Sequence, residues 1–175
     1  LFEDMFQDRS PEELEAIRRK YASKGRVLEA PKMIEAKAHD MLRHYVEAIL
    51  PNGLKAQVVA YSRLAAIRYQ QAFEQARDEL VEEALALDEG TKQLDDVALQ
   101  DKPQRLRAGV RAWRNLDLLK RLEFAAIISP DNNDPGEYRQ WTDPAKMKAR
   151  RERFKKRLGY EDLKHEDPLA FLIVK

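Results

Sequence analysis

Apolar residues recur at two different spacings along this chain, and the two spacings predict helices and strands in alternation. Apolar positions three or four residues apart predict helices that start at Pro11, Pro31 and Ser62, with two more over about 104–122 and 144–158. Short uninterrupted apolar runs predict three strands: Ala56–Tyr61, Phe124–Ser129 and Phe171–Lys175. Alternating strands and helices indicate a helix-rich α/β fold with a short parallel sheet flanked by helices.

Capping and turn residues predict where the helices begin and end. Ser10, followed three residues later by Glu13, forms a capping box, and Pro11 lies at the first helical position. We expect Gly25 to end this first helix and Gly90 to end the long helix that starts at Ser62.

Two of the strands carry further expectations. Ala56–Tyr61 is too uniformly apolar for a half-exposed edge, so we expect a central parallel strand covered on both faces. Phe171–Lys175 is apolar and reaches the last residue without a turn or cap, so we expect the protein to continue beyond it. We interpret residues 1–175 as part of one domain, with a helical insertion over 78–123, a stretch longer than a crossover needs.

Charge is abundant but unevenly distributed. Charged residues make up 36% of the chain, yet the formal net charge is only +1. Residues 78–101 are strongly acidic, whereas Lys146–Arg157 is strongly basic. A basic block can bind nucleic acid, and it can equally be the solvated face of a helix.

Several kinds of active site are excluded by missing residues. The chain has no cysteine, which excludes disulfides and zinc–thiolate sites within it. It has no GxxxxGK[ST] phosphate loop and no GxSxG nucleophile elbow. His39 and His44 are five residues apart on a predicted helix, a poor spacing for a pair of metal ligands. No run of about 20 apolar residues is available to span a bilayer, so we expect no membrane partner.

The junction at Ser62–Arg63 is the strongest candidate for chemistry. A predicted strand ends there and a helix begins with no loop between them. Ser62, the first helical N–H groups and Arg63 could converge on one phosphate. The alternative is structural: Ser62 caps the helix and Arg63 points to solvent.

The ordered segments resemble the second RecA-like motor lobe of the motor and nuclease subunit of type I restriction enzymes, a family in helicase superfamily 2. KAQVVAYSRLAAIRY (Lys55–Tyr69) resembles motif IV, and FAAIISPDNND (Phe124–Asp134) resembles the next core strand and its polar loop. EYRQWTD (Glu137–Asp143) resembles the segment before motif V, and PLAFLIVK (Pro168–Lys175) the strand that leads into it. The resemblance covers nearly the whole chain; the insertion is its least characteristic part.

This resemblance implies a fragment of an ATP-driven translocase of double-stranded DNA, within a type I site-specific deoxyribonuclease of the bacterial or archaeal cytoplasm. ATP and Mg²⁺ would serve the full-length subunit, and this chain alone would bind neither and be inactive. The implied partners are DNA, the first motor lobe, and the modification and specificity subunits. The residues implied at the DNA or lobe interface are Ser62, Arg63, Ser129, Asp131, Asn132 and Asn133. A non-enzymatic helical interaction module is the alternative, and it predicts no parallel sheet.

Overall fold

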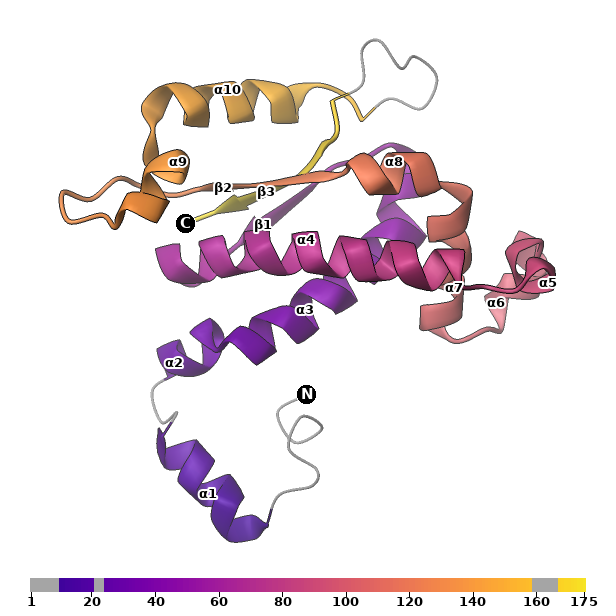
Figure 1. Cartoon of the computed structure of the whole chain (residues 1–175), viewed down its shortest axis with the longest axis horizontal. Helices are drawn as coiled ribbons and strands as arrows, with labels where there is room; N and C mark the ends of the chain where they lie inside the picture. Colours follow the sequence, from indigo (N-terminus) through magenta and orange to yellow (C-terminus); the bar gives the residue numbers. More distant parts are fainter. Residues whose placement is uncertain (1–9, 21–23, 159–166) are drawn as a thin grey trace.

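The computed structural model describes residues 10–20, 24–158 and 167–175, and it has an α/β fold (Figure 1). Before the long helix, the elements are α1 (Pro11–Lys20), α2 (Lys24–Glu29), α3 (Pro31–His44), the π-helix η2 (Tyr45–Ile49), the 3-10 helix η3 (Leu50–Asn52) and β1 (Ala56–Val59). They continue with α4 (Arg63–Leu85), α5 (Glu89–Lys92), α6 (Asp96–Gln100), α7 (Gln104–Arg114) and α8 (Leu116–Arg121). The last elements are β2 (Glu123–Ile127), η4 (Gly136–Tyr138), α9 (Arg139–Thr142), α10 (Pro144–Lys155) and β3 (Leu169–Val174).

The three predicted strands form one parallel sheet in the order β1-β3-β2. This confirms the parallel sheet, but the expectation that Ala56–Tyr61 is central is wrong. The central strand is β3, in which every residue except Val174 is buried. β1 is an edge strand whose residues alternate between half-buried and exposed, and Val59 is 77% exposed. An edge strand has hydrogen-bonded neighbours on one side only, which leaves its outer side open to solvent.

Helices cover the two faces of the sheet. In Figure 1, α4 runs along one face of the sheet, and α3 packs against the side of α4 that faces away from the sheet. α9 and α10 lie on the other face. The chain moves from β1 to β2 in one direction across the sheet and returns from β2 to β3 in the other. Right-handed crossovers made in opposite directions put their helices on opposite faces, as observed here.

An aromatic cluster joins the sheet to the helices beneath it. The ring of Phe171 in β3 lies 4.7 Å, centroid to centroid, from Phe73 of α4 and 4.6 Å from Tyr45 of η2. Phe124 of β2 stacks on Phe73 at 5.3 Å. Phe73 is fully buried and Phe171 is 2% exposed. Aromatic rings bury the most area per residue and gain further from stacked and edge-on contact, so this cluster lies at the centre of the core.

An ion-pair network fastens the amino-terminal end of the sheet. The guanidinium of Arg153 in α10 donates to both carboxylate oxygens of Asp167, at 3.0 and 2.9 Å, and also pairs with Glu123 at 2.8 Å. Asp167 in turn accepts the N–H of Leu169 at 3.0 Å. Burial alone would raise the pKa of Asp167, but the hydrogen bonds from Arg153 and Leu169 outweigh it, and the pKa is lowered. The carboxylate therefore stays ionised where β3 begins.

Local capping is confirmed at the first helix, whereas both glycine stops are wrong. Ser10 and Glu13 form the reciprocal bonds of a capping box, at 3.0 and 3.2 Å. Gly25 lies inside α2, and Gly90 lies inside α5. The long helix instead ends at Leu85, and Asp88 caps α5 by accepting the N–H of Thr91 at 2.9 Å. A new cap two residues before Gly90 makes the glycine a helical residue instead of a terminator.

The expected insertion, 78–123, begins in the last two turns of α4 and continues through the shorter helices α5 to α8. The helix expected over 104–122 is divided at Asn115, whose side chain donates to the C=O of Arg111 at 2.9 Å. Ala112, Leu118 and Leu119 of this stretch belong to the main core, because α7 and α8 pack against α4. Within the described ranges, no helix is both long and apolar enough to cross a membrane.

We predict that Phe171→Ala lowers the free energy of unfolding by about 3–5 kcal/mol, because it removes a buried ring shared by three elements and leaves a cavity. Urea denaturation followed by circular dichroism measures the change. Tyr61→Ala is the matched control, because Tyr61 is 53% exposed and should cost under about 0.5 kcal/mol. Equal losses in both variants would show that the aromatic cluster is not the centre of the core.

Candidate functional site

The sequence-predicted site residues lie at one edge of the molecule, the carboxyl end of the sheet. Ser62 follows β1 and starts α4, and Ser129 and the loop 130–135 follow β2. β3 separates the two strands, so its carboxyl end lies between α4 and the loop. Ligands in open α/β sheets bind at such a crevice, where successive connections leave the sheet toward opposite faces.

Ser62 acts as the N-cap of α4. Its backbone is extended, and its Oγ accepts the N–H of Ala65 at 3.1 Å. This geometry confirms the structural role considered for Ser62. The Oγ still has acceptor and donor capacity, and α4 is 23 residues long, so its positive end also faces this edge.

Arg63 does not point freely into solvent. Its side chain is 26% exposed, and its guanidinium forms an ion pair with Asp134, with Asp131 farther away at 3.8 Å. The guanidinium carbon also lies 5.4 Å from the ring centroid of Tyr138, within cation–π distance. Arg63 Nε is buried and has no hydrogen-bond partner among the residues the structure describes.

The polar loop after β2 is organised by its own aspartates. Asp131 accepts the N–H of Asn133 at 3.1 Å, which is an Asx turn, and Asp134 accepts the N–H of Asp131 at 2.9 Å. The hydrogen bond from Arg63 lowers the pKa of Asp134, which therefore remains a carboxylate. Ser129 and Asn132 are exposed, and their side chains make no hydrogen bond in the described part of the chain. The structure thus brings Arg63 to Asp131 and Asp134 and leaves Ser129 and Asn132 open.

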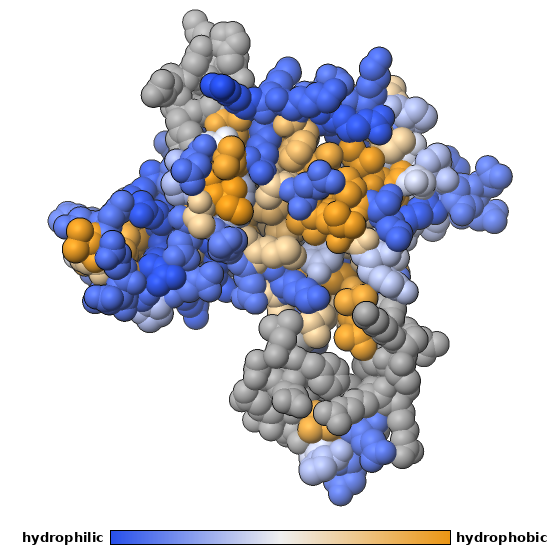
Figure 2. Space-filling model, turned by 180° about the vertical axis from the view of Figure 1, so that it is seen from behind, coloured by the Kyte–Doolittle hydropathy of each residue, from blue (hydrophilic) through white to orange (hydrophobic). Residues whose placement is uncertain are grey.

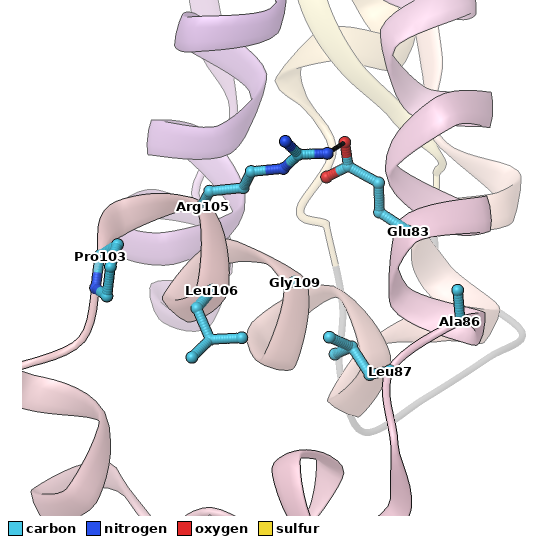
Figure 3. A pocket seen from close by; sticks show the side chains of 7 residues that line it. All are labelled: Glu83, Ala86, Leu87, Pro103, Arg105, Leu106 and Gly109. Carbon is cyan, nitrogen blue, oxygen red and sulfur yellow. Dashed lines mark hydrogen bonds and ion pairs between the residues drawn. The ribbon is translucent and has the colours of Figure 1, made fainter.

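A hollow lies far from the carboxyl end of the sheet, between the end of α4 and α7. It has a volume of about 470 Å³, and Leu87, Leu106 and Gly109 contribute to its apolar lining (Figure 3). Arg105 reaches across its rim to Glu83 at 2.8 Å. The carboxylate of Glu83 is held by ion pairs with Arg43 and Arg105, and the rest of the lining supplies no second acid, base or nucleophile beside it, so we do not take this hollow as the candidate site.

Exposed apolar side chains gather along the free edge of β1. Leu54, Val59 and Tyr61 are 58%, 77% and 53% exposed. β1 lies behind β2 in Figure 1, and the opposite view in Figure 2 shows apolar surface in the middle of the molecule below the hydrophilic band of α10. The apolar pattern of the strand did not reveal this exposure, because exposure depends on which strands are neighbours.

No metal centre is evident in residues 10–20, 24–158 and 167–175. These ranges contain no group of three or more His, Asp or Glu side chains suited to hold an ion. His39 Nε2 lies 3.4 Å from a carboxylate oxygen of Glu79 in α4, a polar contact between α3 and α4 that gives His39 a structural role.

We predict that Ser62→Ala lowers the free energy of unfolding by about 1 kcal/mol, because α4 loses its cap. Ser62→Asp is the matched control and should retain most of the stability, since aspartate also caps. Thermal or urea unfolding of both variants measures this. A Ser62→Asp loss as large as that of Ser62→Ala would contradict the capping role.

We also predict a pH dependence carried by Asp134. Its folded pKa is below its unfolded value of about 3.9, so its stabilising effect is complete above that pH and is lost as the pH falls through the folded pKa. Asp134→Asn should therefore flatten the decline in unfolding free energy below about pH 4. Asp101→Asn, at an exposed position, is the control. An Asp134→Asn curve parallel to that of the unchanged protein would refute the prediction.

No protein family, curated protein or solved structure matches this chain.

Proposed function

We propose that this chain is part of the second RecA-like motor lobe of a type I restriction enzyme, where it contributes DNA-backbone and lobe-interface contacts to an ATP-dependent DNA translocase. One observation carries the proposal. Arg63, at the start of the long helix α4, forms ion pairs with the loop that follows β2 in the same parallel sheet. The same two segments carry the resemblance to motif IV and to the strand after it.

The geometry of Arg63 suits recognition of a phosphate. A guanidinium binds phosphate through two parallel N–H groups, commonly Nε and one terminal nitrogen. Arg63 Nε has no acceptor among the described residues but is buried, and Asp134 occupies a terminal nitrogen, so a phosphate would bind both groups only once the side chain had left Asp134 and turned outward. A DNA phosphate that took the place of Asp134 would gain the helix N-terminus as well. Such contacts are independent of base sequence, as a translocating motor requires.

The parts that would use ATP are proposed for the full-length subunit only. The chain has no phosphate loop, so we assign ATP and Mg²⁺ to the complete two-lobe motor and none to this chain. The proposed partners are double-stranded DNA, the first motor lobe, and the modification and specificity subunits. The contacts assigned to DNA or to the lobe interface are those of Ser62, Arg63, Ser129, Asp131, Asn132 and Asn133.

The alternative, a non-enzymatic helical interaction module, made one expectation about the fold and one about function. Its expectation of no parallel sheet is wrong, because β1, β3 and β2 pair in parallel. A role in protein interaction does not depend on that expectation. The groove along the outer edge of β2 is a surface where such an interaction could take place.

We predict that Arg63→Ala in the full-length subunit reduces ATP-dependent translocation at least about tenfold and flattens the salt dependence of DNA binding by roughly one phosphate contact. A triplex-displacement assay measures translocation, and a salt titration measures binding. Arg105→Ala is the control, because Arg105 of α7 is also paired to an acid, Glu83, but lies near the opposite end of α4 from Arg63. Undiminished translocation by a folded Arg63→Ala subunit would refute the role of Arg63.

A further inference from the structure

A groove of about 290 Å³ runs along the outer edge of β2, on the opposite side of the sheet from β1. We call it the β2-edge groove. One wall is α4, the other is α9 and α10, and the floor is β2. Its lining is Gln70, Glu74, Arg77, Glu123, Phe124, Ala125, Trp141, Arg150 and Arg153.

The floor of the groove presents unpaired main-chain groups. Glu123 donates its N–H to Pro168, and Ile127 accepts from Lys175, so the odd-numbered residues of β2 face β3. Main-chain groups alternate along a strand, so Phe124 turns its N–H and C=O outward. The C=O of Leu122 also faces outward, and Arg77 occupies it at 2.8 Å. Within the described residues, Phe124 has no such partner on its outer side.

Gln70 adds an amide to the α4 wall. The residue is only 6% exposed, and its side chain makes no hydrogen bond in the part of the chain that the structure describes. Among the described residues, the buried side-chain nitrogen and oxygen atoms without a partner are Nε of Arg43 and Nε of Arg63, so the amide of Gln70 is open to water in the groove. A partner bound in the groove could therefore reach it.

Arg150 supplies a cation that Asp143 influences only from beyond ion-pair distance. Its guanidinium carbon lies 4.3 Å from the ring centroid of Trp141, and one terminal nitrogen donates to the C=O of Gln140 at 2.6 Å. Burial lowers the pKa of Arg150, which nonetheless stays charged at neutral pH. The other two arginines of the groove are neutralised, Arg77 by Asp78 and Arg153 by Asp167. No carboxylate in the described ranges forms an ion pair with Arg150.

We propose that the β2-edge groove binds a short extended acidic peptide segment of a partner protein as an added strand. The main chain of the peptide pairs with the outward N–H and C=O of Phe124 and with the amide of Gln70. An acidic side chain, pointing to the α10 wall, pairs with the guanidinium of Arg150. Strand addition obtains affinity from main-chain bonds and specificity from alternate side chains, and this groove offers both.

The alternation of a strand defines the sequence that fits. Successive side chains of the added strand point to opposite walls, so acidic residues at every second position face the α10 wall, and one of them can pair with Arg150. The positions between them face α4, where Gln70, Glu74 and Arg77 line the groove. This inference does not depend on the proposed motor function, because no residue of the groove belongs to the carboxyl edge of the sheet.

The test uses the full chain and a fluorescein-labelled hexapeptide that alternates valine with glutamate. Fluorescence anisotropy should show saturable binding, and the matched peptide that alternates valine with lysine should bind at least about tenfold more weakly. Arg150→Glu should weaken binding of the glutamate peptide at least about tenfold, as expected for loss of a charge-assisted bond. Gln70→Leu should weaken it by a smaller factor, since it removes a neutral hydrogen bond.

Arg151→Glu is the matched control, because Arg151 neighbours Arg150 on α10, is exposed and does not line the groove. It should bind the glutamate peptide within about twofold of the unchanged chain. Circular dichroism confirms that each variant is folded. No binding of the glutamate peptide, equal binding of the lysine peptide, or an equal loss in Arg151→Glu would overturn the proposal. A peptide with its main chain N-methylated at alternate residues should not bind, and its retention would overturn the strand-like mode.

Discussion

The pairing of β3 with both of its neighbours is the constraint on which the rest of this structure depends. β1 and β2 do not touch each other, so neither has a hydrogen-bonded neighbour until β3 lies between them. The two ladders are parallel, which requires long crossovers, and the helices of those crossovers become the layers that bury the sheet. The aromatic rings of β2 and β3 then meet Phe73 of α4 on one face. Removing β3 would leave two unpaired strands and a divided core.

The same pairing brings the candidate site residues together at the carboxyl end of the sheet. Because all three strands run in one direction, the segments that follow β1 and β2 emerge on the same side of the sheet. Arg63 and Asp134 are 71 residues apart in the chain, yet they form an ion pair there. The two connections leave toward opposite faces, so the end of β3 lies in the crevice between them. A DNA phosphate bound there would compete with the carboxylate of Asp134 for the guanidinium of Arg63. The proposed motor function includes that exchange.

The two free edges of the sheet are treated differently by the fold. The β1 edge is open, and its apolar side chains, Val59 above all, are exposed. The β2 edge is walled by α4 and by α9–α10, and the side chains of Gln70 and Arg150 line it. An open apolar edge can pair with many different strands, whereas a walled edge with one unpaired guanidinium accepts a narrower class of peptide segments. This contrast is why the β2 edge, and not the β1 edge, carries the inference of a peptide site.

Much of the fold could be predicted from the sequence, because the element types rest on local interactions. The three strands, the capping box of Ser10 and Glu13, and the cap provided by Ser62 all follow from residues within a few positions of one another. The glycine stops failed for a local reason as well, since Asp88 starts a new helix before Gly90 is reached. At the candidate site, the sequence identified Ser62, Arg63 and the loop after β2, but it did not identify Asp134 as the partner of Arg63 or the ring of Tyr138 beside it.

By itself, the sequence determined which segments are helices or strands and where most of them begin, because hydrophobic spacing and capping act over one or two turns. The tertiary structure alone decided that β3 is the central strand and that Ala56–Val59 is an edge. It also decided that Gln70 and Arg150, 80 positions apart, line one groove. The physical reason is that strand order and side-chain neighbours depend on contacts between distant segments, and no local spacing in the chain encodes which distant segments will pair.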